Sequence, residues 1–449
     1  MAPPHFLLVT FPAQGHVNPS LRFARRLIRT TGARVTFSTC LSVIHRSMIP
    51  NHKNIDTNNL SFLTFSDGFD DGVISNTEDV QNRGLNLERN GQKALSEFIE
   101  ANRNGESPVT YLIYTILLNW VPKLAHRFHL PSSLLWIQPA FVFGIYYNYS
   151  TGNIIKNLPR IEIRDLPSFL SPSNTNKAAQ TEYLELMEFL KEESNPKILV
   201  NTFDALEPEA LKAIPNIEMV AVGPLLPSEI FTGSESREQS SSYSYTSWLD
   251  CKTEYSVIYV SFGTMVELSK KQIEELARAL IQGKRPFLWV ITDKLNREAK
   301  IQGEDETEIE KIAGFRDELE EVGMIVPWCS QIEVLRHRAV GCFLTHCGWS
   351  STLESLVLGV PVVAFPMWSD QPTNAKLLEE RWKTGVRVRE NDEGLVEREE
   401  IRRCLEEVME EKAEELRENA DKWKRLVVEA GGEGGSSDKN IKAFVETLF

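Results

Sequence analysis

Two long stretches of the chain repeat one pattern, in which short apolar runs alternate with longer amphipathic segments. The first stretch contains expected strands at residues 6–11, 34–39, 61–65, 109–114, 133–137 and 197–202, with expected helices at 20–30 and 91–102. The second contains expected strands at 256–262, 286–291, 324–327, 342–345 and 361–365, with an expected helix at 270–282. Such alternation is typical of βαβ units around a buried parallel sheet. It predicts an α/β protein with two doubly wound sheets.

A polar segment at residues 231–247, rich in Ser, Thr and Glu, separates the two stretches. A length of 449 residues suits two large domains or three small ones, and the position of this segment favours two. We therefore expect an N-terminal domain over 1–235, a linker over 236–247 and a C-terminal domain over 248–430. The glycine-rich stretch that follows predicts a flexible joint within 431–449 and a last helix that packs back toward the N-terminal domain. Because parallel sheets bind ligands beyond the carboxyl ends of their strands, the expected site is a cleft between the domains.

The composition excludes several classes of protein. Lys and Arg number 49 against 63 Asp and Glu, a net charge of -14, which disfavours binding to nucleic acids or acidic lipid surfaces. The six cysteines form no C-x-x-C pair and no His cluster has metal-ligand spacing, so we expect reduced thiols and no metal. With no apolar run of membrane-spanning length and no signal-peptide pattern at the start, the expected location is the cytoplasm.

The segment 328–371 carries the strongest functional signal. A strand at 341–345 runs into the turn His346-Cys347-Gly348, and a helix follows from about Trp349. The free N–H groups and positive dipole end of such a helix favour an anion. Gly348 permits close approach, and His346, Ser350 and Ser351 add donors, so a phosphate or diphosphate is the expected guest.

Two further residues of this segment suit the rest of a nucleotide. Glu354, one turn into the helix, could accept hydrogen bonds from a ribose diol, and Trp328 offers a flat face for a base. Taken singly, the tryptophans Trp328, Trp349 and Trp368 would be core aromatics and the serines would be helix caps. Their combination favours a nucleotide site.

The same segment resembles, nearly position for position, the signature box of plant UDP-dependent glycosyltransferases of small molecules. The matching positions are Trp328, Gln331, His337, Phe343, His346, Gly348, Trp349, Ser351, Glu354, Pro361, Pro366, Asp370 and Gln371. Similar segments at 11–16, 201–207 and 259–264 extend the resemblance over essentially the whole chain. Ser330 and Ser350 depart from it, since Pro and Asn are usual there.

The resemblance implies a GT-B fold of two Rossmann-like domains and inverting transfer from a UDP-sugar, with no metal or other cofactor. By resemblance, Trp328 stacks on uracil, the region of Cys329 and Gln331 contacts its edge, and Glu354 holds the ribose. The phosphates fall to His346, Ser350 and Ser351, and the sugar hydroxyls to Trp349, Asp370 and Gln371. Gly348 and Thr264 complete the expected donor site, and the final Gln favours glucose.

In the first domain, His16 follows the first expected strand and precedes the expected helix start at Asn18-Pro19. Nearness to a helix N-terminus predicts a neutral imidazole. The family places its general base here, with Gln14 beside it at the acceptor. Many relatives orient this His with an Asp, whose position here holds Thr115. A hydroxyl cannot stabilise imidazolium as a carboxylate would.

This substitution favours an acceptor that needs almost no base, because a carboxylic acid with a pKa near 4 is already ionised at pH 7. The chain also resembles the plant acyl-acid glucosyltransferases, indole-3-acetate β-glucosyltransferase in particular. The expected reaction is glucose transfer from UDP-glucose to an aromatic acid such as indole-3-acetate or a benzoate, giving a 1-O-acyl glucose ester, by a monomeric enzyme.

Three alternatives stay open at this point. The acceptor could be a phenolic or flavonoid hydroxyl, because close relatives of the group act on flavonoids. The chain could be a non-catalytic UDP-sugar-binding scaffold, for which Thr115 is the sequence support. An NAD-dependent oxidoreductase would use similar domains, but no G-x-G-x-x-G follows the first expected strand.

Overall fold

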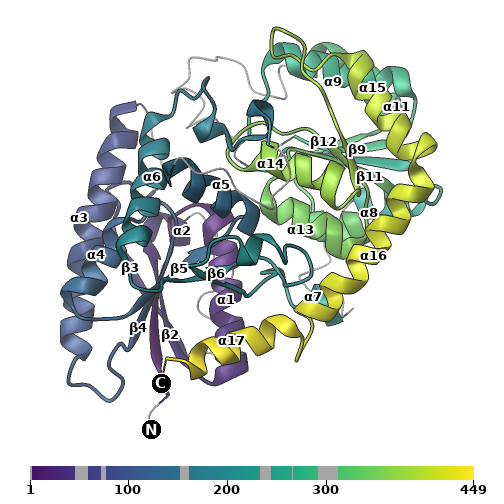
Figure 1. The fold of residues 1–449 in the computed structure, drawn as a ribbon. Coiled ribbons are helices and arrows are strands. Elements are labelled where there is room, and N and C mark those ends of the chain that lie inside the picture. The colour runs from purple at the N-terminus through teal and green to yellow at the C-terminus, as the bar shows by residue number, and fades with distance from the viewer. Residues whose placement is uncertain are drawn as a thin grey trace.

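The computed structural model describes residues 3–45, 59–71, 77–151, 161–232, 244–264, 266–291 and 312–448. In these ranges the expected alternation forms two parallel sheets, each with helices on both faces (Figure 1). The α/β prediction with two doubly wound sheets is confirmed.

The N-terminal sheet has seven strands in the order β3-β2-β1-β4-β5-β6-β7. All its neighbouring strands pair in parallel. The strands are β1 (His5–Val9), β2 (Arg34–Cys40), β3 (Leu60–Phe65), β4 (Tyr111–Thr115), β5 (Ser132–Trp136), β6 (Lys197–Val200) and β7 (Glu218–Ala221). The order reverses between β1 and β4, and doubly wound sheets bind ligands at such a point.

The C-terminal sheet has six strands in the order β10-β9-β8-β11-β12-β13, again all parallel. The strands are β8 (Val257–Ser261), β9 (Phe287–Val290), β10 (Met324–Val326), β11 (Val340–Thr345), β12 (Val362–Ala364) and β13 (Gly385–Arg387). Here the order reverses between β8 and β11. Each domain therefore has one switch point, and the loops that leave it lie at the carboxyl ends of the central strands.

The helices of the N-terminal domain include α3 and α4 on one side of its sheet and α1 on the other (Figure 1). The first eight helices are α1 (Gln14–Thr31), α2 (Leu41–His45), α3 (Thr77–Asn102), α4 (Trp120–Arg127), α5 (Ala140–Thr151), α6 (Lys177–Glu192), α7 (Glu229–Thr232) and α8 (Ser244–Asp250). The helices that come after the first C-terminal strand, β8, are α9 (Lys270–Gly283), α11 (Arg316–Val322), α12 (Gln331–Arg336), α13 (Trp349–Leu358), α14 (Gln371–Lys376), α15 (Arg398–Glu406), α16 (Ala413–Gly431) and α17 (Ser436–Glu446).

The start of α1 differs from the sequence prediction. The helix begins at Gln14 with Ala13 as its N-cap, and Pro19 lies inside it instead of at its first position. Backbone bonds from His16 N and Val17 N to Ala13 O, both 2.9 Å, form the first turn. The Asn-Pro pair is a common start signal, but here the helix already exists one turn earlier. His16 therefore lies within the first helical turn, not before it.

The segment between the two sheets runs from Ala221 to Val257. Most of the expected linker, 236–243, lies outside the described residues, and α8 begins at Ser244 within its remaining part. The two expected domains thus correspond to two separate sheets.

The last helix returns to the N-terminal domain, where α17 lies beside α1 (Figure 1). Asp438 of α17 pairs with Arg26 at 2.6 Å and with Arg29 at 3.1 Å, both from α1. Asn440 donates to the backbone oxygen of Ala221 at 2.9 Å. These contacts hold α17 on the N-terminal domain, and a buried ion pair links the two ends of the chain.

A second group of contacts joins the domains near the carboxyl ends of the strands. Asp165, a buried residue of the N-terminal domain, pairs with Lys376 at 3.1 Å and with Arg387 at 2.7 Å. Ser168 N donates to Ser369 O, and Ser369 N donates to Ser168 Oγ, each at 2.7 Å. These bonds hold the loop before α14 against the N-terminal domain.

Candidate active site

The turn between β11 and α13 presents a helix N-terminus suited to an anion. Gly348 is the N-cap of α13, and the first helical bond runs from Thr352 N to Gly348 O at 2.9 Å. The N–H groups of Trp349, Ser350 and Ser351 therefore precede the hydrogen-bonded ladder. Together with the helix dipole they favour negative charge at this position. This is the geometry that the sequence predicts for a diphosphate.

His346 lies between two glycines that leave room for its ring. A Cβ at Gly263 would be 2.8 Å from its Cε1, and a Cβ at Gly348 would be 2.5 Å from its Nε2. Gly263 follows β8 and has φ +73, so glycine is favoured there on conformational grounds too. Burial lowers the pKa of His346 to about 4. The imidazole is neutral at pH 7 and can donate one hydrogen bond to a phosphate oxygen.

Gln331, at the start of α12, joins two of the expected ligand-binding residues of α13. Its Nε2 donates to Glu354 Oε2 at 2.6 Å and to Ser351 Oγ at 3.0 Å. Glu354 is buried, and this burial raises the pKa of its carboxyl. The amide holds the carboxylate in one orientation, which suits an acceptor for paired hydroxyls.

Tyr259 of β8 is a residue of this cluster that sequence reasoning missed. Its hydroxyl donates to Gln331 Oε1 at 3.3 Å and lies 3.4 Å from Cys329 Sγ. The bond fixes which end of the Gln331 amide faces Glu354. Tyr259 lies in a continuous apolar run, and a buried strand residue of that kind gives no sequence signal for such a role.

Two other expected donor residues are exposed. Trp328 is 58% exposed, so part of its surface is accessible to a base. Thr264, in the turn after β8, is exposed. Ser330, where the family usually has Pro, is the N-cap of α12 and accepts from Glu333 N. The substitution therefore keeps a helix start.

The loop before α14 holds the two residues expected at the sugar. Gln371 Oε1 accepts from Met367 N and Trp368 N, each at 2.9 Å, which fixes the orientation of its side-chain amide. Asp370 is buried and accepts from Asn374 Nδ2 at 2.7 Å. Burial raises the pKa of Asp370 to about 6.

Trp349 has a different place from the one expected of a sugar-binding side chain. Its indole N–H donates to Asn201 O of the N-terminal domain at 2.7 Å, and its ring centroid lies 5.9 Å from that of Trp382. These contacts bury the indole at the interface between the two domains. Only the backbone N–H of Trp349 is positioned to reach a ligand at the helix end.

His16 lies beside the N-terminal switch point, in the first turn of α1. Its ring centroid is 5.1 Å from that of Phe11. Nδ1 is buried without a hydrogen-bond partner in the described part of the chain. Burial lowers the pKa of His16 to about 3, so the ring is neutral, as expected, but through desolvation instead of the helix dipole. Gln14, two residues earlier, is exposed.

Thr115 ends β4, the strand on the other side of this switch point. It is fully buried, and its Oγ1 accepts a hydrogen bond from Phe11 N at 3.0 Å. Its hydroxyl therefore fixes the loop that precedes His16, and among the described residues no hydrogen bond joins the two side chains. Phe11 contacts both residues: its backbone N–H donates to Thr115, and its ring packs against the ring of His16.

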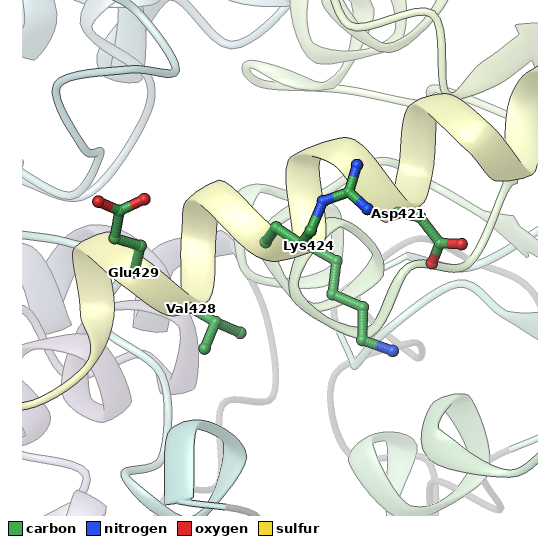
Figure 2. Close-up of a pocket in the computed structure, with 5 residues that line it drawn as sticks. Asp421, Lys424, Val428 and Glu429 are labelled. Carbon is green, nitrogen blue, oxygen red and sulfur yellow. The ribbon is translucent and has the colours of Figure 1, made fainter.

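A separate surface hollow of about 520 Å³ lies along α16, where it is lined by Asp421, Lys424, Arg425, Val428 and Glu429. Figure 2 shows that these residues come from one helix. None of the expected site residues lines this hollow. We therefore place the candidate active site at the strand ends, where the polar side chains converge.

Within the described residues, no group of His, Cys, Asp or Glu is arranged to hold a metal ion. No described helix combines the length and apolar character needed to span a bilayer. All six cysteines are unpaired thiols.

The fold and the site together suit an enzyme that uses a nucleotide sugar. A family profile described as "UDP-glucoronosyl and UDP-glucosyl transferase" matches residues 209–426. The chain is 82% identical to UDP-glycosyltransferase 75B2 of Arabidopsis thaliana over 100% of both chains. It is 49% identical to phloretin 4'-O-glucosyltransferase of Malus domestica over 99% of this chain and 97% of the relative.

Solved structures point to the same family. Os79 from O. sativa in complex with UDP has a TM-score of 0.83 and 31% identity, covering 99% of this chain and 100% of that chain. The chain belongs to the plant family 1 UDP-glycosyltransferases, within the group that includes 75B1 and 75B2. It has the GT-B fold and is a UDP-sugar-dependent transferase, so the scaffold and oxidoreductase alternatives are not carried forward.

Proposed function

We propose that this enzyme transfers glucose from UDP-glucose to the carboxylate of an aromatic acid, such as indole-3-acetate or a benzoate, with inversion at the anomeric carbon. The observation that carries the proposal is the environment of His16. Its buried Nδ1 has no carboxylate or other partner within the described chain, and Thr115, where an orienting Asp is usual, is bonded to Phe11.

The weak basicity of His16 supports a carboxylate acceptor. Moving a proton from a phenol of pKa about 10 to a base of pKa about 3 is uphill by roughly 9 kcal/mol. A carboxylic acid with a pKa near 4 is already ionised at pH 7 and avoids this cost. We therefore assign His16 mainly to positioning the acceptor, with base catalysis as its second role.

On the donor side, we assign the uracil to Trp328 and the backbone around Cys329, and the ribose to Glu354 as oriented by Gln331. The α13 N-terminus and His346 take the diphosphate, whose growing negative charge in the transition state is the main electrostatic demand of the reaction. Asp370 and Gln371 take the glucose hydroxyls. The protein supplies neutral dipoles at this position, so a net charge of -14 is no obstacle to an anionic donor.

A phenolic or flavonoid hydroxyl is the second candidate acceptor. It is favoured by the 49% identity to an enzyme named for transfer to the 4'-oxygen of phloretin. In that case Phe11 and Thr115 would have to hold His16 well enough for base catalysis without a carboxylate.

An acceptor panel tests the proposal. Purified enzyme, UDP-glucose and equal concentrations of indole-3-acetate, benzoate and two simple phenols are incubated at pH 7, with UDP release measured and products separated by mass spectrometry. We expect alkali-labile glucose esters with a kcat/KM at least about 100-fold above that for the phenols. Equal rates for phenols and acids would contradict the assignment.

A further inference from the structure

Gln138 is an N-terminal-domain residue that reaches the carboxylate expected to bind the sugar. Gln138 lies just after β5 and is only 6% exposed. Its Nε2 is 3.3 Å from Asp370 Oδ1, 3.3 Å from Ser369 Oγ and 3.2 Å from Tyr183 OH. A single amide thus bridges the two domains at the loop before α14.

The other end of the same amide has no partner. Gln138 Oε1 is buried and makes no hydrogen bond within the described chain. Asn374 Oδ1 and Tyr146 OH, two more polar atoms close to Asp370, are in the same state. Leaving a buried polar group unpaired is costly, and native proteins keep few of them. An oxygen of this kind beside a sugar-binding carboxylate is suited to accept from a bound hydroxyl group.

The charge on Asp370 depends on the hydrogen bonds that it accepts. Its titratable neighbours are Tyr146 of α5, Tyr183 of α6 and Cys347 of the β11–α13 turn, and burial raises the pKa of each, so all are uncharged at pH 7. No neighbouring cation among them stabilises the carboxylate. Hydrogen bonds do so instead: Asn374 Nδ2 and Gln138 Nε2 donate to its two oxygens, one from each domain. The Ser369 hydroxyl also lowers the pKa of Asp370.

We propose that Gln138 is a positioning residue for the transferred sugar: it holds Asp370 Oδ1 across the domain interface and presents its carbonyl oxygen to the same sugar. The inference rests on the proposed binding of glucose by Asp370. Since UDP lacks the glucose, Gln138 should contribute to the binding of UDP-glucose and not to that of UDP. This difference separates a role at the sugar from a general role in folding.

The test compares Gln138→Leu, which removes both hydrogen-bonding ends at similar volume, with Gln180→Leu on α6 as the matched control. Binding of UDP and of unreactive UDP-2-fluoro-glucose is measured by calorimetry, and kcat/KM for UDP-glucose is measured from pH 5 to 8. We expect the fluoro-sugar nucleotide to bind Gln138→Leu about 10-fold more weakly, the size of one hydrogen bond to a charged group, with UDP affinity within twofold of wild type.

The pH profile is a second readout. The active form of Asp370 is the carboxylate, so activity falls as pH drops through its pKa, about 6. Removing the Gln138 donor raises that pKa, because the charged form loses a hydrogen bond. The acid limb of Gln138→Leu should therefore move to higher pH, whereas that of Gln180→Leu should stay. If Gln138→Leu does not fold by circular dichroism, Gln138→Met replaces it.

Asp370→Ala, measured in parallel, distinguishes the two levels of the argument. If Asp370→Ala loses affinity for the sugar nucleotide while Gln138→Leu binds it as tightly as wild type does, the inference is overturned and the proposed site stays intact. Equal losses of UDP and sugar-nucleotide affinity in Gln138→Leu would also overturn it, by showing a structural role. Wild-type binding in Asp370→Ala would overturn the proposed role of Asp370 and the inference with it.

Discussion

The side chains expected to bind the UDP-sugar and the imidazole expected at the acceptor differ in whether hydrogen bonds within the protein hold them. On the donor side, Gln331, Glu354 and Gln371 are held by hydrogen bonds of 2.6–3.0 Å to neighbouring groups. On the acceptor side, the Nδ1 atom of His16 has no partner in the described chain. In the proposed site, these donor-side residues are therefore preorganised by the protein, while the His16 imidazole is left to be oriented by packing and by the substrate.

The difference follows from what each side must recognise. A UDP-sugar presents fixed positions for a base, a ribose, two phosphates and a sugar, so side chains held in place lose little freedom when it binds. The acceptor side has only to present an oxygen nucleophile to the anomeric carbon. If that nucleophile arrives ionised, a strongly oriented base is unnecessary. The predictions below test this contrast, from the largest expected effect to the smallest.

Replacement of His16 should separate the two acceptor classes. In His16→Ala, kcat/KM for a phenol should fall by about 10²-fold, the low end of the usual contribution of a general base, because His16 is a weak one. For indole-3-acetate the fall should be about 10-fold or less, since no proton has to be removed. Steady-state kinetics with both acceptors measure the ratio, and Gln14→Ala is the neighbouring control. Equal losses for both acceptors would show that the contrast is wrong.

Replacement of Glu354 should affect the donor alone. Glu354→Ala removes the expected ribose acceptor and leaves Gln331 with one partner fewer, so we expect UDP to bind about 10- to 100-fold more weakly, in line with a charged hydrogen bond of about 1.5–3 kcal/mol. Calorimetry with UDP measures the change. Glu333→Ala, an exposed carboxylate on the neighbouring α12, should bind UDP normally. Unchanged affinity in Glu354→Ala would remove this residue from the site.

Replacement of Trp328 tests the base position. Stacking of a base on an aromatic ring contributes about 1–3 kcal/mol, so Trp328→Ala should weaken UDP binding by about 5- to 100-fold, and Trp328→Phe should recover part of it. Tyr255→Ala removes another exposed aromatic of the same domain and serves as the control. Similar affinities for Trp328→Ala and the control would mean that the base stacks elsewhere.

Introduction of a carboxylate at Thr115 should shift acceptor preference by a smaller factor. Thr115→Asp places a carboxylate at the end of β4, near Phe11 and His16, where it could stabilise the imidazolium that forms when a hydroxyl is deprotonated. We expect the ratio of phenol to carboxylate kcat/KM to rise by about 10-fold. Thr115→Asn, with the same size and no charge, is the control. A ratio that stays the same in both variants would dissociate Thr115 from acceptor choice.

Much of the fold could be predicted from the sequence because buried parallel strands are short apolar runs with clear boundaries. The two strands that escaped notice, β7 (Glu218–Ala221) and β13 (Gly385–Arg387), lie at sheet edges, are only four and three residues long, and carry charged residues at one end. The start of α1 was misplaced because Pro19 imitates a first-turn proline. Local signals of this kind fail when the surrounding helix is already established by tertiary packing.

The site was only partly accessible to sequence reasoning, for a different reason. Motif residues such as His346 and Glu354 are contiguous with a strand end and a helix start, so their neighbourhood follows from local structure. Gln138 and Tyr259 lie about 230 and 70 residues from their polar partners Asp370 and Gln331. Their roles depend on how the domains and strands pack together, which a single sequence does not show. The same holds for the indole of Trp349, which faces the domain interface.

An acceptor that carries both groups tests the central claim most directly. With 4-hydroxybenzoate and UDP-glucose at pH 7, the carboxylate and the phenol of one molecule compete at the same concentration, each reacting from its own binding orientation. Alkali treatment and NMR then locate the glucose in the first product formed. The account predicts the 1-O-acyl glucose ester as the main product, and a stable phenolic glucoside as the main product would contradict it.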